Sequence, residues 1–309
     1  MKDIYARVKR WAVLPVFAMI FLVTGCADLT VLDPKGPVGE SQSDLIIFSI
    51  ILMLFVVAVV FVAFTYMIIK YRERPDRGEK DYDPDHEGNT KLEIIWTVIP
   101  LIIVTALSIP TVITIYELEE PPEASSEKEP LVVYATSADW KWFFSYPEQD
   151  IETVNYLHIP TDRAIEFRLS SADSMASLWI PALGGQKYNM AGMENTLYLQ
   201  ADEKGTYEGR NSNFTGSGFA EQTFDVHAES ASDFESWVEE TQEEASELTQ
   251  EKYDSLLAPG LLEEMEFSST HLDYVDHGTH QGSDYLIKRH KEAFEEPLHL
   301  EGGRGVEDE

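Results

Sequence analysis

Two long apolar runs dominate the first half of the chain, Leu45 to Tyr71 and Ile94 to Tyr116. About 20 apolar residues suffice for a helix to cross the ~30 Å hydrocarbon core of a bilayer, and both runs are at least that long. The second run contains Pro100 and Pro110, which a membrane span tolerates because neighbouring groups can satisfy the freed carbonyls. The pattern predicts transmembrane helices over 45–71 and 94–116.

The segment between the two runs, residues 72–93 with Lys70 just before it, is rich in basic side chains. Short basic loops stay on the cytoplasmic side of a membrane. We therefore expect a cytoplasmic loop at 72–93, an external segment at 26–44, and an external location for everything after the second span. The basic residues are Lys70, Arg72, Arg74, Arg77, Lys80 and Lys91.

After a proline- and glutamate-rich linker at 117–130, the pattern changes to short segments in which every second residue is apolar. Ile165, Phe167 and Leu169 are one example. Such alternation, bounded by Gly, Pro and Asp, is typical of strands with one buried face. It predicts an antiparallel sandwich or barrel over 131–230.

From residue 231 to residue 309 the acidic content rises, and this pattern predicts a mostly disordered tail, part of it an exposed helix. Three histidines lie close together in it, His271, His277 and His280. The spacing His277-x-x-His280 can bind a divalent metal, but in an acidic tail without apolar support we favour solvated histidines.

The N-terminus has the layout of a signal peptide over residues 1–25: basic residues, an apolar stretch, then small residues. Its ending, Val23-Thr24-Gly25-Cys26, resembles the lipobox of bacterial lipoproteins, which implies a lipid-acylated Cys26 and a further membrane tether. The alternative is an uncleaved anchor helix in which the cysteine has no role. Because Cys26 is the single cysteine, internal disulfides and two-cysteine metal sites are excluded.

Composition adds a constraint on partners. The chain of 309 residues has 55 acidic and 23 basic residues and a formal charge of −32. This excess argues against a nucleic-acid partner, because binding to phosphate backbones requires clustered Lys and Arg. A solvated surface explains the charge better than attraction of a basic partner protein.

An aromatic segment, "SADWKWFFSYP", places Trp140 and Trp142 near three further rings. Large rings in a short strand pack in a core or at an interface. Core packing is the simpler interpretation. The alternative is that Trp140 and Trp142 dock the domain on a partner near the membrane.

Four features together resemble subunit II of the haem-copper terminal oxidases: two spans with "KLEIIWTVIP" in the second, the aromatic segment, a "SLWIP" turn, and the glycine-rich loop "GTYEGRNSNFTGSGFAEQTFDV". In the cytochrome c oxidases of this family, a cupredoxin sandwich holds two copper ions through such a loop. Tyr207 and Gly209 match the copper-loop pattern. The ligand positions carry other residues: Ala176, Asn211, Asn213, Thr215, Phe219 and Gln222.

Loss of these ligands is itself typical of quinol oxidase subunit II, and "PALGGQKYNMAGM" is similar to quinol oxidases of that kind. The resemblance implies a cupredoxin-like Greek-key domain at 131–230 that binds no metal or cofactor. It further implies haem and copper in a partner subunit I, smaller membrane subunits, and quinol as the substrate of a complex that reduces oxygen and translocates protons. The implied location is a bacterial cell membrane, multi-pass, with the C-terminal domain on the extracytoplasmic side.

Glu93 stands at the cytoplasmic mouth of the second span. In the oxidase family an acid at this position leads into a proton path through subunit I. An acid is also favoured in the first turn of any helix, by about 0.3–1 kcal/mol, so both roles stay open. A different class of function is also open, a non-catalytic membrane lipoprotein whose cupredoxin-like domain binds a protein.

Overall fold

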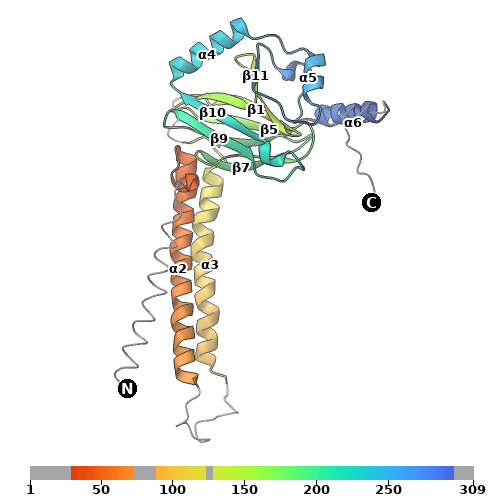
Figure 1. Ribbon diagram of the computed structural model, residues 1–309. Coiled ribbons are helices and arrows are strands. Elements are labelled where there is room, and N and C mark those ends of the chain that lie inside the picture. The colour runs from red at the N-terminus through yellow and green to blue at the C-terminus, as the bar shows by residue number, and fades with distance from the viewer. Residues whose placement is uncertain (1–28, 73–87, 123–127, 296–309) are drawn as a thin grey trace, which may run out of the picture.

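Two long antiparallel helices carry a β-sandwich at one end, and further helices pack on the sandwich (Figure 1). The computed structural model describes residues 29–72, 88–122 and 128–295, with side chains as far as residue 289. The expected signal peptide, Cys26 and most of the expected cytoplasmic loop lie outside the described residues.

The first long helix, α2 (Pro37–Tyr71), begins earlier than the apolar run because its first turns belong to the external domain. Pro37 suits the first helical position, where no backbone N–H is required. Val38 and Gly39 are buried, and the chain just before the helix pairs with the domain through Lys35 N–H to Ala182 O at 2.7 Å. A short 3₁₀ turn, η1 (Thr30–Leu32), precedes it. The sandwich is therefore fixed to the top of α2.

The second long helix, α3 (Thr90–Glu117), begins at a polar cap. The side-chain oxygen of Asn89 accepts hydrogen bonds from Lys91 N and Leu92 N at 3.1 and 3.4 Å. Pro100 and Pro110 lie inside the helix without ending it. Both α2 and α3 are long and apolar enough to cross a membrane.

The sandwich has a six-stranded sheet, in the order β11-β3-β2-β1-β5-β8, and a five-stranded sheet, β4-β10-β9-β6-β7. Two pairs, β1–β5 and β10–β4, are parallel, whereas we predicted antiparallel strands, because residue alternation does not reveal strand direction. The strands before the C-terminal segment are β1 (Leu131–Ala138), β2 (Lys141–Tyr146), β3 (Ile151–Val154), β4 (Tyr156–Pro160), β5 (Ile165–Ser171), β6 (Ala176–Ile180), β7 (Gly184–Asn189), β8 (Asn195–Leu199), β9 (Gly205–Asn211) and β10 (Thr223–Glu229).

The core lies between the two sheets, where the alternating residues of each strand meet. Ile165, Phe167 and Leu169 of β5 are fully buried, as the alternation predicts. Opposite them, Leu178 of β6 and Val226 of β10 are also fully buried in the same cluster. The predicted cupredoxin-like sandwich over 131–230 is therefore present.

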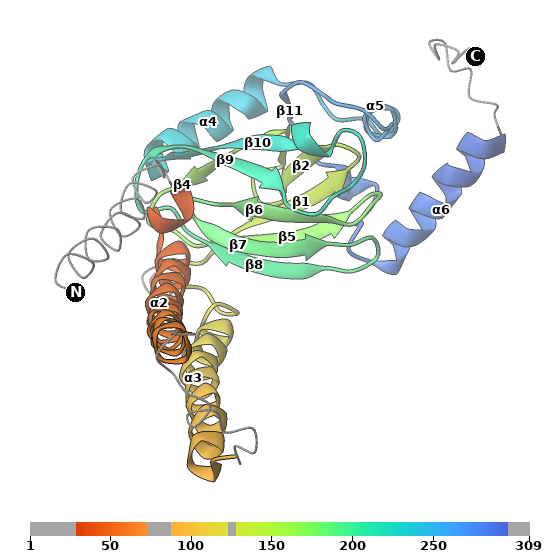
Figure 2. The same cartoon turned by 60° about the horizontal axis from the view of Figure 1, so that its bottom comes forward.

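The prediction of a mostly disordered tail is wrong for residues 231–295, which we call the C-terminal extension. It contains α4 (Ala231–Glu244), α5 (Gln250–Leu256), β11 (Met265–Phe267), a 3₁₀ turn η5 (His271–Asp273) and α6 (His280–Glu295). Strand β11 pairs with β3 and so completes the larger sheet. Figure 2 shows α4 and α6 on opposite sides of the sandwich.

Although the extension is acidic overall, apolar residues recur along it and are buried. Phe234 of α4 joins the main core. Leu248, Tyr253 and Leu256 form a second cluster with Phe143 of β2. Because the charges of α4 and α5 lie on the opposite faces, the acidic segment is both soluble and folded.

Candidate functional site

The loop that resembles a copper loop joins β9 to β10 at one end of the sandwich. These strands are antiparallel neighbours, and the loop between them contains a short 3₁₀ turn, η4 (Phe219–Glu221). Its start lies against β6, where Leu178 pairs with Asn211. The fold therefore brings together segments that are far apart in the sequence, as a ligand site at this loop would require.

Three of the six replaced positions, Asn211, Thr215 and Gln222, form a hydrogen-bonded group that we call the amide cluster. Asn211 Nδ2 donates to Gln222 Oε1 at 2.8 Å and to Thr215 Oγ1 at 3.1 Å. Thr215 Oγ1 in turn donates to Gln222 Oε1 at 3.2 Å. Each member of the cluster is thus bonded to both others.

The amide cluster is tied to the surrounding backbone as well. Asn211 Oδ1 accepts from the backbone N–H groups of Ser177 and Asn213, both at 2.9 Å. Gln222 Nε2 donates to two carbonyls, those of Ala138 and Lys141, at 3.3 Å. These bonds offset the cost of burying two carboxamides, whose residues are only 3% and 2% exposed.

The donor set of this cluster does not fit copper. A thiolate-bridged copper pair needs soft sulfur ligands and imidazoles, whereas the cluster offers neutral carboxamides and a hydroxyl that already bond one another. Among residues 29–72, 88–122 and 128–295, no group of three or more His, Cys, Asp or Glu is placed to hold a metal ion. The loop therefore closes the end of the sandwich through hydrogen bonds in place of metal coordination.

The remaining three positions surround the cluster without joining it. Ala176 is buried at the start of β6. Asn213 Nδ2 donates to the carbonyl of Met175 at 2.7 Å. Phe219 is half-buried, and its ring lies 5.5 Å from that of Phe214.

The two tryptophans of the aromatic segment have different positions. Trp142 is fully buried and stacks on Phe144 with ring centroids 6.3 Å apart, so the prediction that it docks a partner is wrong. Both faces of β2 are covered, which leaves no residue of that strand at the surface.

Trp140 is half-buried and covers the loop. Its Nε1 donates to the carbonyl of Thr215 at 2.9 Å. A Cβ at Gly218 would overlap the Trp140 ring, which explains glycine at that position. A docking role for Trp140 stays a prediction.

Glu93 lies in the first turn of α3 and is exposed. Its backbone N–H donates to Asn89 O at 3.0 Å, and the Asn89 side chain caps the helix. The helix start thus has its own cap, and within the described residues 88–122 the side-chain capping bonds come from Asn89.

The histidines of the extension correct our expectation of solvated side chains. His271 and His277 are buried, and only His280 is exposed. His271 Nδ1 lies 2.7 Å from the carboxylate of Glu152, and neither side chain is exposed. His277 Nε2 lies 2.9 Å from the hydroxyl of Tyr253.

Burial, with smaller Coulombic contributions from His271 and Arg289, lowers the pKa of His277 from 6.5 to about 3. Glu152 and Tyr253 were absent from our sequence-based candidates. Nothing in the local pattern of β3 marks a buried acid, because its partner His271 is far away along the chain.

Comparison with known proteins shows the family to which the chain belongs. The family described as cytochrome C oxidase subunit II, transmembrane domain, matches residues 26–113. The chain is 61% identical over 288 residues to quinol oxidase subunit 2 of Bacillus subtilis, covering 93% of this chain and 89% of that protein. It is 48% identical over 285 residues to quinol oxidase subunit 2 of Bacillus cereus, covering 92% and 97%.

Among solved structures, the periplasmic domain of subunit II of cytochrome oxidase of Bradyrhizobium japonicum is similar at a TM-score of 0.36 and 23% identity. This match covers 37% of this chain and 94% of that one, and it concerns the fold alone. Nearly the whole chain thus aligns with close relatives that share one name. The chain belongs to the quinol oxidase subunit 2 family, in the wider family of haem-copper oxidase subunit II.

Proposed function

We propose that this chain is the copper-free structural subunit of its quinol oxidase and that no electrons pass through its external domain. The observation that supports this most directly is the amide cluster, where Asn211, Thr215 and Gln222 bond one another. Amide and hydroxyl groups have no accessible redox couple, and they leave no soft ligand for a metal.

The nature of the electron donor explains why the domain can lack a metal. Quinol is soluble in the membrane, so it can deliver electrons within the bilayer to haem and copper in subunit I without an external relay. The domain would then serve assembly, covering the outer face of subunit I beside the smaller membrane subunits. The alternative, a non-catalytic lipoprotein that binds a protein, has no counterpart among the relatives described above.

Purified complexes that contain Asn211→Ala or Thr215→Val test this role. Both changes break hydrogen bonds of the cluster. We expect less assembled complex but unchanged quinol oxidation per haem, and no oxidation of cytochrome c by either variant or by the wild type. A fall in quinol oxidation per haem in a fully assembled variant would show that the cluster lies on the electron path.

We further propose that Glu93 takes up protons at the cytoplasmic side. Its carboxylate is exposed at the start of α3, and Asn89 already caps that helix. Ionisable groups at membrane depth are costly and often mark proton paths; at the boundary, where Glu93 lies, that cost is small. The helix-start role is the competing explanation.

Glu93→Gln separates these roles, because glutamine keeps the size and loses the exchangeable proton. Proton uptake predicts normal assembly and haem content with slower turnover. Glu117→Gln, at the opposite end of α3, is the matched control and should leave turnover unchanged. Full quinol oxidase activity in an assembled Glu93→Gln complex would rule out proton uptake through this residue.

A further inference from the structure

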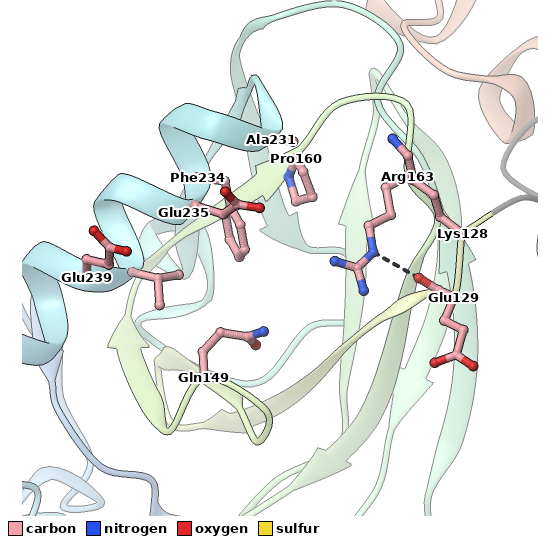
Figure 3. A pocket seen from close by; sticks show the side chains of 10 residues that line it. Lys128, Glu129, Gln149, Pro160, Arg163, Ala231, Phe234, Glu235 and Glu239 are labelled. Atoms are coloured by element: carbon pink, nitrogen blue, oxygen red, sulfur yellow. Dashed lines mark hydrogen bonds between the residues drawn. The ribbon is translucent and has the colours of Figure 1, made fainter.

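A cavity of ≈ 520 Å³ lies between α4 and the edge of the sandwich, beside Lys128 and Glu129 (Figure 3). Its floor is apolar and consists of Phe234 and Val238 of α4 together with Pro160 at the end of β4. Phe234 is 5% exposed and belongs to the main core. The volume lies within the ~300–1,000 Å³ typical of small-molecule sites.

One wall of the cavity is cationic. Arg163 Nε donates to the carbonyl of Glu129 at 2.9 Å, which fixes the plane of the guanidinium group. Its two terminal nitrogens face the cavity (Figure 3) and have no partner among the described residues. Lys128 stands next to it on the same wall. Arg163 is half-buried, and the hydrogen bond of its guanidinium to Glu129 lies where solvent reaches.

The opposite wall is anionic. Glu235 and Glu239 lie one helical turn apart on α4, across the cavity from Arg163, and both side chains are exposed to solvent. In Figure 3 the Glu235 carboxylate lies nearer the cavity, and that of Glu239 lies farther along the helix. In the part of the chain that the structure describes, neither forms an ion pair with Arg163 or Lys128. The two charged walls are therefore too far apart to neutralise each other directly.

The cavity also has an unsatisfied polar group and fixed walls. Gln149 lines it, and its Oε1 is buried without a hydrogen-bond partner. Helix α4 is held by Gln242 Nε2, which donates to Gln149 O at 2.5 Å. It is also held by Trp237, which stacks on His158 with centroids 4.3 Å apart. These contacts hold α4 against the edge of the sandwich.

We propose that this cavity binds a small zwitterion, a carboxylic acid with an amino group at the far end of an apolar chain. The carboxylate would accept two parallel hydrogen bonds from the terminal nitrogens of Arg163. The chain would cover Phe234 and Val238, and the ammonium group would lie between Glu235 and Glu239.

Each simpler ligand leaves one part of this site unmatched. The carboxylates of Glu235 and Glu239 would repel a plain anion, and Arg163 and Lys128 would repel a plain cation. An apolar molecule would take water from the guanidinium of Arg163 without replacing its hydrogen bonds, which is costly. A zwitterion matches both walls and the floor.

Saturation-transfer difference NMR on the purified oxidase complex tests the proposal, with 6-aminohexanoate as the probe. Hexanoate and hexylamine, which each lack one charge, are the comparison probes. We expect saturation transfer to 6-aminohexanoate, less transfer to the other two, and loss of the signal in Arg163→Ala. Arg210→Ala is the matched control, because Arg210 pairs with Glu208 outside the cavity.

A second variant tests the anionic wall. Replacing both Glu235 and Glu239 by glutamine should weaken binding of 6-aminohexanoate and strengthen binding of hexanoate, because the repulsion of a plain carboxylate is gone. Equal signals from the three probes, unchanged binding in Arg163→Ala, or no saturation transfer to 6-aminohexanoate would each overturn the proposal. Quinol oxidation by Arg163→Ala should stay at the wild-type level, since the cavity is independent of the electron path.

Discussion

Replacing Glu152 by alanine tests whether the C-terminal extension is an integral part of the external domain. The Oε2 atom of Glu152 accepts hydrogen bonds from Ser145 Oγ at 2.8 Å and from the backbone N–H of His271 at 2.8 Å. It also lies 2.7 Å from His271 Nδ1. This one oxygen therefore joins β2, β3 and the extension at a site that water does not reach.

The expected effect is large because the pair is completely buried. Glu152→Ala leaves two buried donors, the Ser145 hydroxyl and the His271 backbone N–H, without their acceptor, and each unsatisfied buried group costs about 1–3 kcal/mol. At about 1.4 kcal/mol per factor of ten, a total of about 2–6 kcal/mol should raise the detached population of the extension roughly 30-fold to 20,000-fold. Glu152→Gln keeps an acceptor for the imidazole and should cost less.

Limited trypsin digestion at Lys252, in α5, measures the detached population, because cleavage within a helix requires local opening. We expect faster cleavage in the order wild type, Glu152→Gln, Glu152→Ala. Glu148→Ala, at an exposed acid in the turn before β3, is the control and should match the wild type. Equal cleavage rates in Glu152→Ala and Glu148→Ala would refute a stabilising role for the buried pair.

Three further predictions concern proton binding and processing. The pKa of His277 falls from 6.5 to about 3 in the fold, so the detached extension binds a proton that the attached one excludes. Below pH 6.5, trypsin cleavage measured relative to an unfolded peptide at the same pH should accelerate, but less in His277→Gln. Desolvation lowers the pKa of Lys141 from 10.5 to about 8, so the free energy of unfolding should rise with pH between these values, and Lys141→Met should flatten that slope in denaturant titrations. Mass spectrometry of the mature chain should find an acylated Cys26 at its start; an unmodified chain beginning at Met1 would contradict this.

Much of the fold could be predicted because its signals are local. An apolar run of sufficient length identifies a membrane span wherever it occurs, and alternation in β5 identifies the buried Ile165, Phe167 and Leu169. The residues of the amide cluster could also be identified from the sequence, since the loop spacing aligns Asn211, Thr215 and Gln222 with the ligand positions of the copper loop. Their hydrogen bonds to one another required the structure.

The sequence-based predictions failed where long-range contacts decide the structure. Composition suggested disorder after residue 230, but Tyr253 and His271 are buried by a core that distant strands supply. Alternation could not place Trp142, because β2 is covered on both faces. The cavity beside Arg163 could not be predicted from the sequence either, because its lining residues come from distant segments, among them Lys128, β4 and α4.

The copper content and near-infrared absorption of the purified complex test most directly whether the amide cluster stands in place of a metal centre. With Asn211, Thr215 and Gln222 already bonded to one another, we predict no near-infrared band of a thiolate-bridged copper pair in a complex that oxidises quinol, even after copper is added. Such a band, arising from this subunit, would contradict the account.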